Sequence, residues 1–476
     1  MKRIFAAVLL LSLLLLAGCG AKPAETPQPD QPTSAPTGEP TPGAATPAVS
    51  EDGRIILTIG AFKTENGSNY DLQSYYRLEQ AVKRFNDRNK TYVVEIKDYG
   101  DAASPDALYL LNSEIGAGQM PDMLVTYGMP VEKYGANGLL VDLYEWYDKA
   151  EFFSGPLRSM ETDGKLYKVS SAVSIVTCYG LKDVVGEEGG YESIYRAWSE
   201  FDTGNKMFIT QLDALNTFML LTEIQLSTLV DKSKAECRFN TSEFIGLLEF
   251  CKTLPAEPIA TETELYAQNV NPMDIMPLCV KNRDAMLGLF TTQAEIGAVD
   301  ALHASLLTVL DGEEITFTGV PGTSPAASGC FCELPIAVSA KSANLDGARE
   351  FLDSLWDVRY TQFYEGELRT IPLMRSVFDD HYKAEMARAE TFTDENGVER
   401  RGIVYVNYLP YTEEDLQAFA GLIENASLPV SSLNVFGQAE PIILEEAIAF
   451  FGGIQSAEQT AENIQTRYTL FLEEQK

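Results

Sequence analysis

The feature that constrains the fold most strongly is the pattern of a buried strand followed by that of an amphipathic helix. Residues 54–62 form a compact apolar run, rich in Ile and bounded by polar segments. Such a run is typical of a parallel strand covered on both faces. In residues 76–86 the apolar positions recur at i, i+3, i+4 and i+7, on Leu78, Ala81, Val82 and Phe85. A strand and an amphipathic helix are therefore expected in succession.

The same alternation then repeats. Residues 92–96 form a second strand pattern, and Ser104 with Pro105 supplies an N-cap and a first-turn proline for a second helix. That helix is expected to bury Leu108, Leu111 and Ile115 and to end at the glycines 116 and 118. Residues 121–127 form a third strand pattern. Strand, helix, strand, helix and strand in this order predict an open α/β sheet.

The length of the chain calls for more than one such sheet. Residues 54–476 exceed what one hydrophobic core serves, because cores stop growing near about 250 to 300 residues. Two lobes are therefore expected.

The N-terminus has the pattern of a lipoprotein signal peptide. Lys2 and Arg3 precede an apolar stretch over residues 4–16, which leads into Leu-Ala-Gly-Cys ending at Cys19. A membrane span needs about 20 apolar residues, and this stretch is shorter. We predict that residues 1–19 are a signal peptide, that Cys19 carries a diacylglycerol thioether, and that its freed amine takes a further acyl chain. Two or more chains are what stable anchoring requires.

Residues 20–53 are dominated by Pro, Thr, Ala, Gln and Gly. A segment of this composition cannot bury a core, so we predict a disordered spacer between the lipid and the folded body.

The net charge excludes one class of partner. The chain has 69 acidic and 36 basic residues, which gives a formal charge of -33. Nucleic-acid binders need a basic surface to replace counterions, so a nucleic-acid partner is not expected. The acidic charge suits a soluble protein body that an anionic cell envelope repels.

Six cysteines follow Cys19, at positions 178, 237, 251, 279, 330 and 332. With no CxxC spacing and only two histidines, no metal site is expected. Most of these thiols should be buried. Export permits a disulfide, and Cys237 with Cys251 is the pair to test first. Cys330 and Cys332 share one strand face and are too far apart to bridge without bending.

We predict a hairpin and a helix within residues 376–432, as an addition (a decoration) to the second lobe. Residues 390–392 and 401–406 flank Asn396-Gly397, the strongest short hairpin signal. A capping box at residues 412–415 precedes a helix that is expected to bury Leu416, Phe419 and Ile423. A calcium loop at residues 394–397 is the alternative, but the segment lacks the spaced carboxylates of an EF-hand, so a simple turn is favoured.

Several segments together carry a family resemblance. They are residues 85–86, 114–122, 138–143, 163–167, 336–342, 347–352, 448–453, 456–459 and 464–468. In this order they resemble the extracellular solute-binding proteins that serve ABC importers. The resemblance covers most of the mature chain. One departure is that Lys168-Val169-Ser170 stands where such chains often carry Gly-x-Pro.

The resemblance implies a two-lobed periplasmic-binding-protein-like fold, each lobe an open, mostly parallel sheet flanked by helices. It assigns residues 54–167 and 285–334 to the first lobe. Residues 168–284 and 335–476, with the decoration at 376–432, form the second lobe. It also implies a hinge of crossing strands near Tyr167, Ala285 and Glu333.

A ligand site is expected where aromatic residues follow strands, because ligands bind at the carboxyl ends of parallel strands and between domains. The candidates are Phe62, Lys63, Glu65, Tyr99, Tyr127, Tyr179, Trp198, Phe290 and Glu333. Rings would stack on an apolar sugar face while Lys63, Glu65 or Glu333 holds hydroxyls. Simple core packing is the alternative for each ring, and it is the prediction for Trp146 and Trp356.

No catalytic motif such as GxSxG, HExxH or a phosphate loop occurs in the sequence, and no cofactor is expected. The resemblance implies a monomeric, lipid-anchored binding protein on the extracellular face of the membrane. It would deliver a small solute to an ABC permease. Abundant aromatic residues and the resemblance favour a sugar or oligosaccharide, and a cationic solute or a peptide, which an acidic cleft would equally serve, stays open. Two alternatives stay open: a carbohydrate-active enzyme that uses paired acids, and a ligand-sensing lipoprotein that feeds a receptor.

Overall fold

The computed structural model describes most of the chain after residue 47. The described residues are 48–63, 69–100, 105–126, 129–187, 191–201, 206–210, 212–231, 234–256, 272–292, 306, 308–321, 327–356, 362–364, 367–368, 371–380, 390–393, 399–402, 413–430 and 439–474. The predicted signal peptide, Cys19 and nearly all of the spacer lie outside them.

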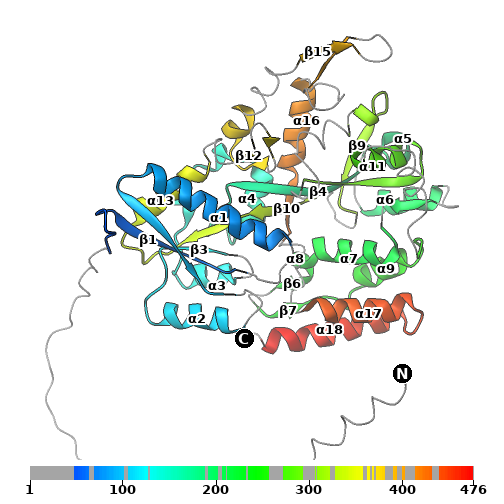
Figure 1. Ribbon diagram of the computed structural model, residues 1–476. Helices are drawn as coiled ribbons and strands as arrows, with labels where there is room; N and C mark the ends of the chain where they lie inside the picture. The colour runs from blue at the N-terminus through cyan, green and yellow to red at the C-terminus, as the bar shows by residue number, and fades with distance from the viewer. Residues whose placement is uncertain are drawn as a thin grey trace, which may run out of the picture. The chain divides into compact units, whose positions relative to one another are not determined.

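The first sheet has four strands in the order β11-β3-β1-β2. Strands β1 (Ile55–Ala61), β2 (Tyr92–Asp98) and β3 (Met123–Val125) are mutually parallel, and β11 (Ile336–Val338) runs antiparallel to β3. Figure 1 labels β1 and β3 of this sheet. Leu57 and Ile59 of β1 are fully buried, as expected for a strand covered on both faces. The predicted succession of three parallel strands is confirmed.

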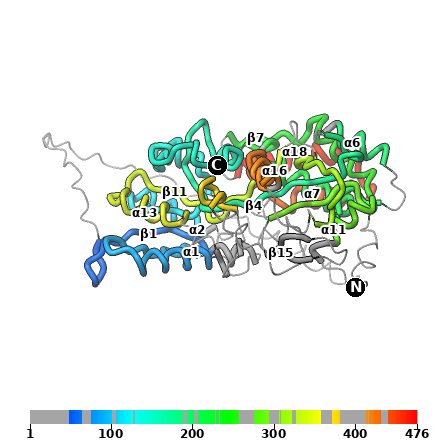
Figure 2. Tube along the Cα trace, turned by 90° about the horizontal axis from the view of Figure 1, so that it is seen from above, coloured from blue at the N-terminus to red at the C-terminus, as the bar shows by residue number. Residues whose placement is uncertain are grey.

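Helices α1 (Asn69–Arg88), α2 (Pro105–Gly116), α3 (Val131–Ala136) and α13 (Leu345–Leu355) accompany this sheet. Helix α1 runs alongside β1 (Figure 2). Its predicted apolar face is confirmed, because Leu78, Ala81, Val82 and Phe85 are all buried. Phe85 meets Phe351 of α13 edge to face, with ring centroids 5.3 Å apart.

The second sheet has seven strands and mixed orientation. Its main path is β17 (Ala426–Val430), β10 (Ser328–Glu333), β4 (Ala172–Leu181), β8 (Ala285–Thr291) and β5 (Met207–Ile209), and β9 (Ile315–Gly319) and β14 (Ile371–Pro372) also pair with β4. Every residue of β4 is buried. Because β4 pairs antiparallel with β8, β9, β10 and β14, this sheet lacks a single carboxyl edge.

The other described helices are α4 (Ser154–Met160), α5 (Lys182–Val185), α6 (Tyr191–Glu200), α7 (Ala214–Ile224), α8 (Leu226–Leu229), α9 (Ser242–Cys251), α11 (Pro272–Lys281), α16 (Glu413–Glu424), α17 (Glu440–Phe451) and α18 (Ala457–Glu474). Two-stranded pairs join β6 (Val230–Asp231) to β7 (Glu236–Cys237), β12 (Gln362–Tyr364) to β13 (Glu367–Leu368), and β15 (Glu390–Thr393) to β16 (Glu399–Gly402).

The strand pairing corrects the predicted division into lobes. Residues 285–334 were assigned to the first lobe, but β8 and β10 from this segment belong to the second sheet. Residues 335–476 were assigned to the second lobe, but β11 pairs with β3 in the first sheet. The physical reason is that a short apolar strand has the same local pattern in either sheet, and only its long-range pairing decides between them.

Two adjacent segments that the structure describes throughout, residues 167–171 and 334–335, connect the two sheets, and the chain passes between the sheets again in residues 339–370, of which the structure describes a part. Val169 and Ile336 bond to each other there through both backbone amides, at 3.0 and 2.9 Å. Leu334 adopts a positive φ of 55°, which is strained for a residue with a branched side chain. Two of the three predicted hinge crossings, near Tyr167 and Glu333, coincide with these segments. Ala285 does not, because β8 lies within the second sheet.

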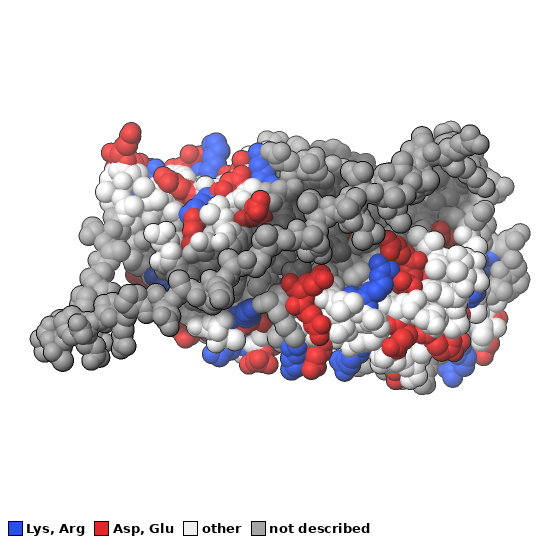
Figure 3. Space-filling view, turned by 90° about the horizontal axis from the view of Figure 1, so that it is seen from below, with Lys and Arg blue, Asp and Glu red and all other residues white. Residues whose placement is uncertain are grey.

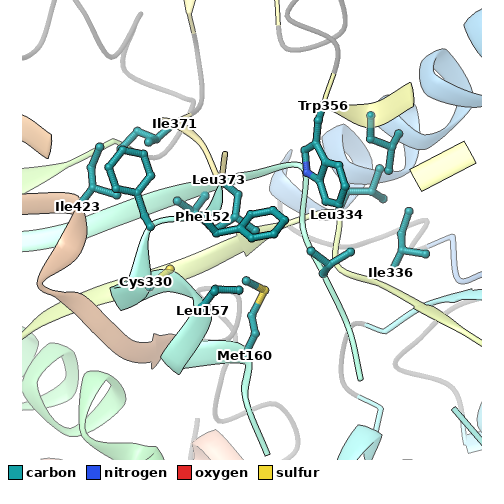
Figure 4. Close-up of a cluster of buried hydrophobic side chains, with 14 of the residues drawn as sticks. Phe152, Leu157, Met160, Cys330, Leu334, Ile336, Trp356, Ile371, Leu373 and Ile423 are labelled. Carbon is teal, nitrogen blue, oxygen red and sulfur yellow. The ribbon is translucent and has the colours of Figure 1, made fainter. Parts of the chain in front are cut away.

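One large apolar cluster contains buried residues of both sheets. Phe152, Leu157 and Met160 pack there with Cys330 of β10, and Trp356 lies in the same cluster (Figure 4). Trp356 is 6 % exposed and Trp146 packs against the cluster, so the prediction that both belong to the core is confirmed.

The six described cysteines are all free thiols. The pair singled out for a disulfide is therefore not bridged: Cys251 is buried, whereas the Cys237 sulfur lies 3.4 Å from the Thr469 hydroxyl. Burial raises the pKa of the Cys251 thiol, which makes it unreactive.

The predicted hairpin and helix are present as β15, β16 and α16. Phe419 and Ile423 of α16 are fully buried, and Leu416 is 7 % exposed, as expected. Residues 394–397, where a calcium loop was the alternative, lie outside the described residues.

Candidate functional site

The carboxyl ends of β1, β2 and β3 lie at one edge of the first sheet, because the three strands are parallel. Phe62 and Lys63 follow β1, Tyr99 follows β2, and Thr126 follows β3. In open α/β sheets this edge is where ligands bind. We call the group formed by Phe62, Lys63 and Tyr99, together with Tyr75 of helix α1, the strand-end site.

Phe62 and Tyr99 contact each other, with ring centroids 5.7 Å apart and ring planes 35° apart. The backbone holds them in place, because the Tyr99 amide donates to Ala61 and the Lys63 amide donates to Gly100, both at 2.9 Å. Gly60 leaves room for the second ring, since a Cβ there would lie 2.9 Å from a Tyr99 ring carbon. Tyr99 is 5 % exposed and Phe62 is half-buried, so Phe62 presents the more accessible ring.

A carboxylate fixes the Tyr99 ring. Glu114 of α2 accepts hydrogen bonds from the Tyr99 hydroxyl and from the Lys97 ammonium, each at 2.6 Å. Burial acts to raise the pKa of Glu114, but these two hydrogen bonds outweigh it and hold the pKa below its ordinary value. Burial and the neighbouring Glu114 raise the pKa of Tyr99, so its hydroxyl stays protonated.

Helix α1 adds a third ring that the sequence analysis missed. The Lys63 ammonium lies 5.6 Å from the centroid of the Tyr75 ring, within cation-π range. Burial, followed by the charges of Asp98 and Glu79, raises the pKa of Tyr75. A signal was available, because Tyr75 lies three residues before Leu78 and so extends the apolar stripe of α1 by one turn.

Glu333, a predicted ligand contact, is bonded within the protein. Its side chain is 2 % exposed, and one carboxylate oxygen lies 2.5 Å from the Arg77 guanidinium. The other oxygen accepts a hydrogen bond from Ser174 of β4 at 2.6 Å. Nothing in the local sequence pairs Arg77 with Glu333, which is 256 residues away.

The three aromatic candidates of the second sheet and its helices are core residues. Tyr179 is 1 % exposed, Trp198 4 % and Phe290 5 %. Tyr179 lies opposite Gly288 of β8, where an added Cβ would meet the tyrosine ring at 2.2 Å. These three rings have no accessible face for stacking; Tyr99 is as buried as Phe290, so its part in the strand-end site is to support the accessible ring of Phe62.

Two candidates, Glu65 and Tyr127, lie outside the described residues. Among the residues that are described, no group of three or more His, Cys, Asp and Glu side chains is placed to hold a metal ion. Within the same part of the chain, no helix has both the length and the apolar character needed to cross a membrane.

The charged surface is mixed. Figure 3 shows acidic side chains interspersed with basic ones on one face of the described body. The described part of this face therefore presents no continuous basic stripe of the kind that tracks a nucleic-acid backbone.

The fold defines a class, in which two α/β sheets are connected by adjacent crossing segments. Solved structures with this fold include an extracellular solute-binding protein of family 1 from Alicyclobacillus acidocaldarius, with a TM-score of 0.50 and 14 % identity. The sugar-binding protein MalE from Xanthomonas citri has a TM-score of 0.51 and 14 % identity. Each match covers 88 % of this chain and 98 % of the other.

The predicted two-lobed α/β fold and the resemblance to extracellular solute-binding proteins are thus confirmed at the level of the fold. Neither a protein-family model nor a curated protein sequence matches the chain.

Proposed function

We propose that this protein is the substrate-binding component of an ABC-type importer and captures a sugar or oligosaccharide. The Phe62–Tyr99 ring pair, together with the Lys63 ammonium that lies over the Tyr75 ring, is the observation that carries the proposal. An aromatic face suits the apolar face of a sugar ring, and an ammonium donates to hydroxyls. The fold shared with the sugar-binding protein MalE from Xanthomonas citri supports the same class of ligand.

The proposed mechanism is hinge closure. Ligand would contact the strand-end site, together with Glu65 and Tyr127, and then a surface of the second lobe. Bending would occur at the two crossing segments, residues 167–171 and 334–335. A ligand shifts such an equilibrium only by its higher affinity for the closed form. Chemistry on the ligand is not part of the proposal, which assigns no catalytic residue and no cofactor.

The first experiment is a thermal-shift screen of the protein without its signal peptide against sugars, amino acids and polyamines. A ligand present at a hundred times its dissociation constant adds about 2.7 kcal/mol to the apparent stability. A sugar should raise the melting temperature, whereas a shift with amino acids or polyamines alone would refute the proposed ligand class.

The lipid on Cys19 and the spacer complete the proposal. They would hold a monomeric receptor at the outer face of the membrane, close to its permease, and so raise its local concentration. The variant Cys19→Ala should be released from cells, should bind ligand normally, and should support uptake poorly. Full uptake by the released protein would refute the role of the anchor.

A further inference from the structure

The Glu333 carboxylate lies where three elements meet. It ends β10, accepts a hydrogen bond from Ser174 of β4, and pairs with Arg77 of α1 at 2.5 Å. Arg77 is 11 % exposed and Glu333 is 2 % exposed, so the pair is largely shielded from water. We call Arg77, Ser174 and Glu333 the crossing cluster.

The crossing cluster adjoins the place where the chain leaves the second sheet for the first. Leu334 and Pro335 follow Glu333 directly, and the backbone carbonyl of Glu333 accepts a hydrogen bond from the Ser170 hydroxyl on the other crossing segment. The indole of Trp356 donates to the Ser170 carbonyl at 3.3 Å. Both crossing segments are therefore bonded to each other beside the ion pair.

The same short segment also reaches the edge of the first sheet at which Phe62 and Tyr99 lie. The carbonyl of Pro335 accepts a hydrogen bond from the Thr126 amide, at the carboxyl end of β3. On the other side, Arg77 lies two residues from Tyr75 on the same helix, and Tyr75 contacts the Lys63 ammonium. The crossing cluster thus connects to the strand-end site through α1 and through β3.

We propose that Arg77 and Glu333 are positioning residues, which couple the geometry of the crossing segments to the strand-end site. The expected effect on ligand affinity rests on the proposed function, whereas the expected effect on the crossing segments needs no ligand. The pair fixes α1 against the end of β10, so that bending at the crossing segments moves the site residues in a defined way. Neither residue has to touch the ligand.

Burial gives the pair this role, because surface ion pairs hold geometry weakly while a buried charge must keep its partner. Removing one member leaves a buried charge unpaired. Replacing both by uncharged residues of similar size avoids that penalty. A double variant therefore separates positioning from simple loss of stability.

The test compares Arg77→Met, Glu333→Gln and the double variant with the wild type. In the double variant the glutamine keeps an oxygen for Ser174. The variant Lys83→Met is the matched control, because Lys83 lies on the same helix in an exposed ion pair with Asp87. The variant Arg77→Lys keeps a cation for Glu333 and should behave like the wild type.

The ligand-free readout is amide hydrogen exchange. We expect the amides of Val169 and Ile336, which bond the crossing segments to each other, to exchange about tenfold faster in the double variant. Amides of α18 should not change, whereas a purely global loss of stability would accelerate both. Unchanged exchange at Val169 and Ile336 would overturn the inference.

The second readout is affinity by calorimetry for the oligosaccharide that binds the wild type most tightly in the thermal-shift screen, with maltotriose tested first. The double variant should bind about tenfold more weakly, and Lys83→Met normally. Faster exchange with unchanged affinity would overturn the coupling to the site. If the wild type binds no sugar at all, the proposed function fails, and the exchange experiment still decides whether the pair fixes the crossing.

Discussion

Aromatic residues of the two sheets have different surroundings although the sequence presents them alike. Phe62 and Tyr99 follow parallel strands of the first sheet and lie at its carboxyl edge, where Phe62 keeps an accessible ring. Tyr179 and Phe290 lie on β4 and β8, which are antiparallel neighbours inside the second sheet, and their rings are buried. The difference in accessibility therefore concerns Phe62, because Tyr99 of the first sheet is 5 % exposed and so as buried as Phe290.

Two buried or partly buried carboxylates, one beside the first sheet and one on α7, differ in their hydrogen-bond partners. Glu114 beside Tyr99 is bonded to a cation and a hydroxyl. Glu223 of α7 has one buried carboxylate oxygen without a hydrogen-bond partner among the described residues. Both hydrogen bonds of Glu114 favour its charged form, whereas this buried oxygen of Glu223 has no such contact.

The largest effect should come from the variant Tyr179→Ala. Its ring fills space between β4 and Gly288, and removing a buried aromatic ring leaves a cavity that costs about 3 to 5 kcal/mol of unfolding free energy. Urea denaturation measures the loss. Ligand affinity of the folded fraction should not change, and a loss of affinity without a loss of stability would place Tyr179 in the ligand site.

The second effect is pH-dependent and concerns Glu223. Burial, with a smaller contribution from the charge of Glu440, raises the pKa of Glu223 from 4.5 to about 7. The folded protein therefore keeps a proton that the unfolded chain loses, so the stability falls as the pH rises from 4.5 to 7.

The variant Glu223→Gln removes this cost, because the amide does not ionise. It should stabilise the protein by about 1 kcal/mol at pH 5 and by about 3 kcal/mol at pH 8. Urea denaturation at both pH values measures the difference. The variant Glu249→Gln, at an exposed position on α9, is the control. Equal stabilisation at both pH values would contradict the assignment.

Sequence patterns predicted the first sheet better than the second for a physical reason. The strand and helix periods of β1 and α1 are local, and Phe62 meets Tyr99 because neighbouring parallel strands end together. The sheet that β8 and β11 join depends on long-range pairing, which leaves no local signal. The same holds for Arg77, whose partner Glu333 is 256 residues away.

The third effect is on sugar affinity. The variant Phe62→Ala removes the accessible ring of the strand-end site and should weaken sugar affinity about tenfold, or about 1.4 kcal/mol. Because Phe62 is half-buried, the loss of stability should be small. Calorimetry measures the affinity. The variant Tyr109→Ala, which removes a ring that is 75 % exposed on α2, is the control and should bind normally. Equal affinity in both variants would remove Phe62 from the site.

Tyr127 completes the predicted aromatic edge although it lies outside the described residues. We expect the variant Tyr127→Ala to weaken binding about tenfold without unfolding the protein. Unchanged calorimetric affinity would leave Phe62 as the stacking ring at this edge and sink the assignment of Tyr127.

The smallest effect separates the ring of Tyr99 from its hydroxyl. The variant Tyr99→Phe keeps the contact with Phe62 but removes the hydrogen bond to Glu114, which should cost about 1 kcal/mol of unfolding free energy. The pKa of Glu114 should rise, because burial is then opposed only by the hydrogen bond and the charge of Lys97, and carboxyl NMR titration measures this shift. Sugar affinity should be nearly unchanged if the hydroxyl serves only to orient the ring. A tenfold loss of affinity would instead show that the hydroxyl itself contacts the ligand, and the strand-end site would then offer a polar contact next to its stacking face.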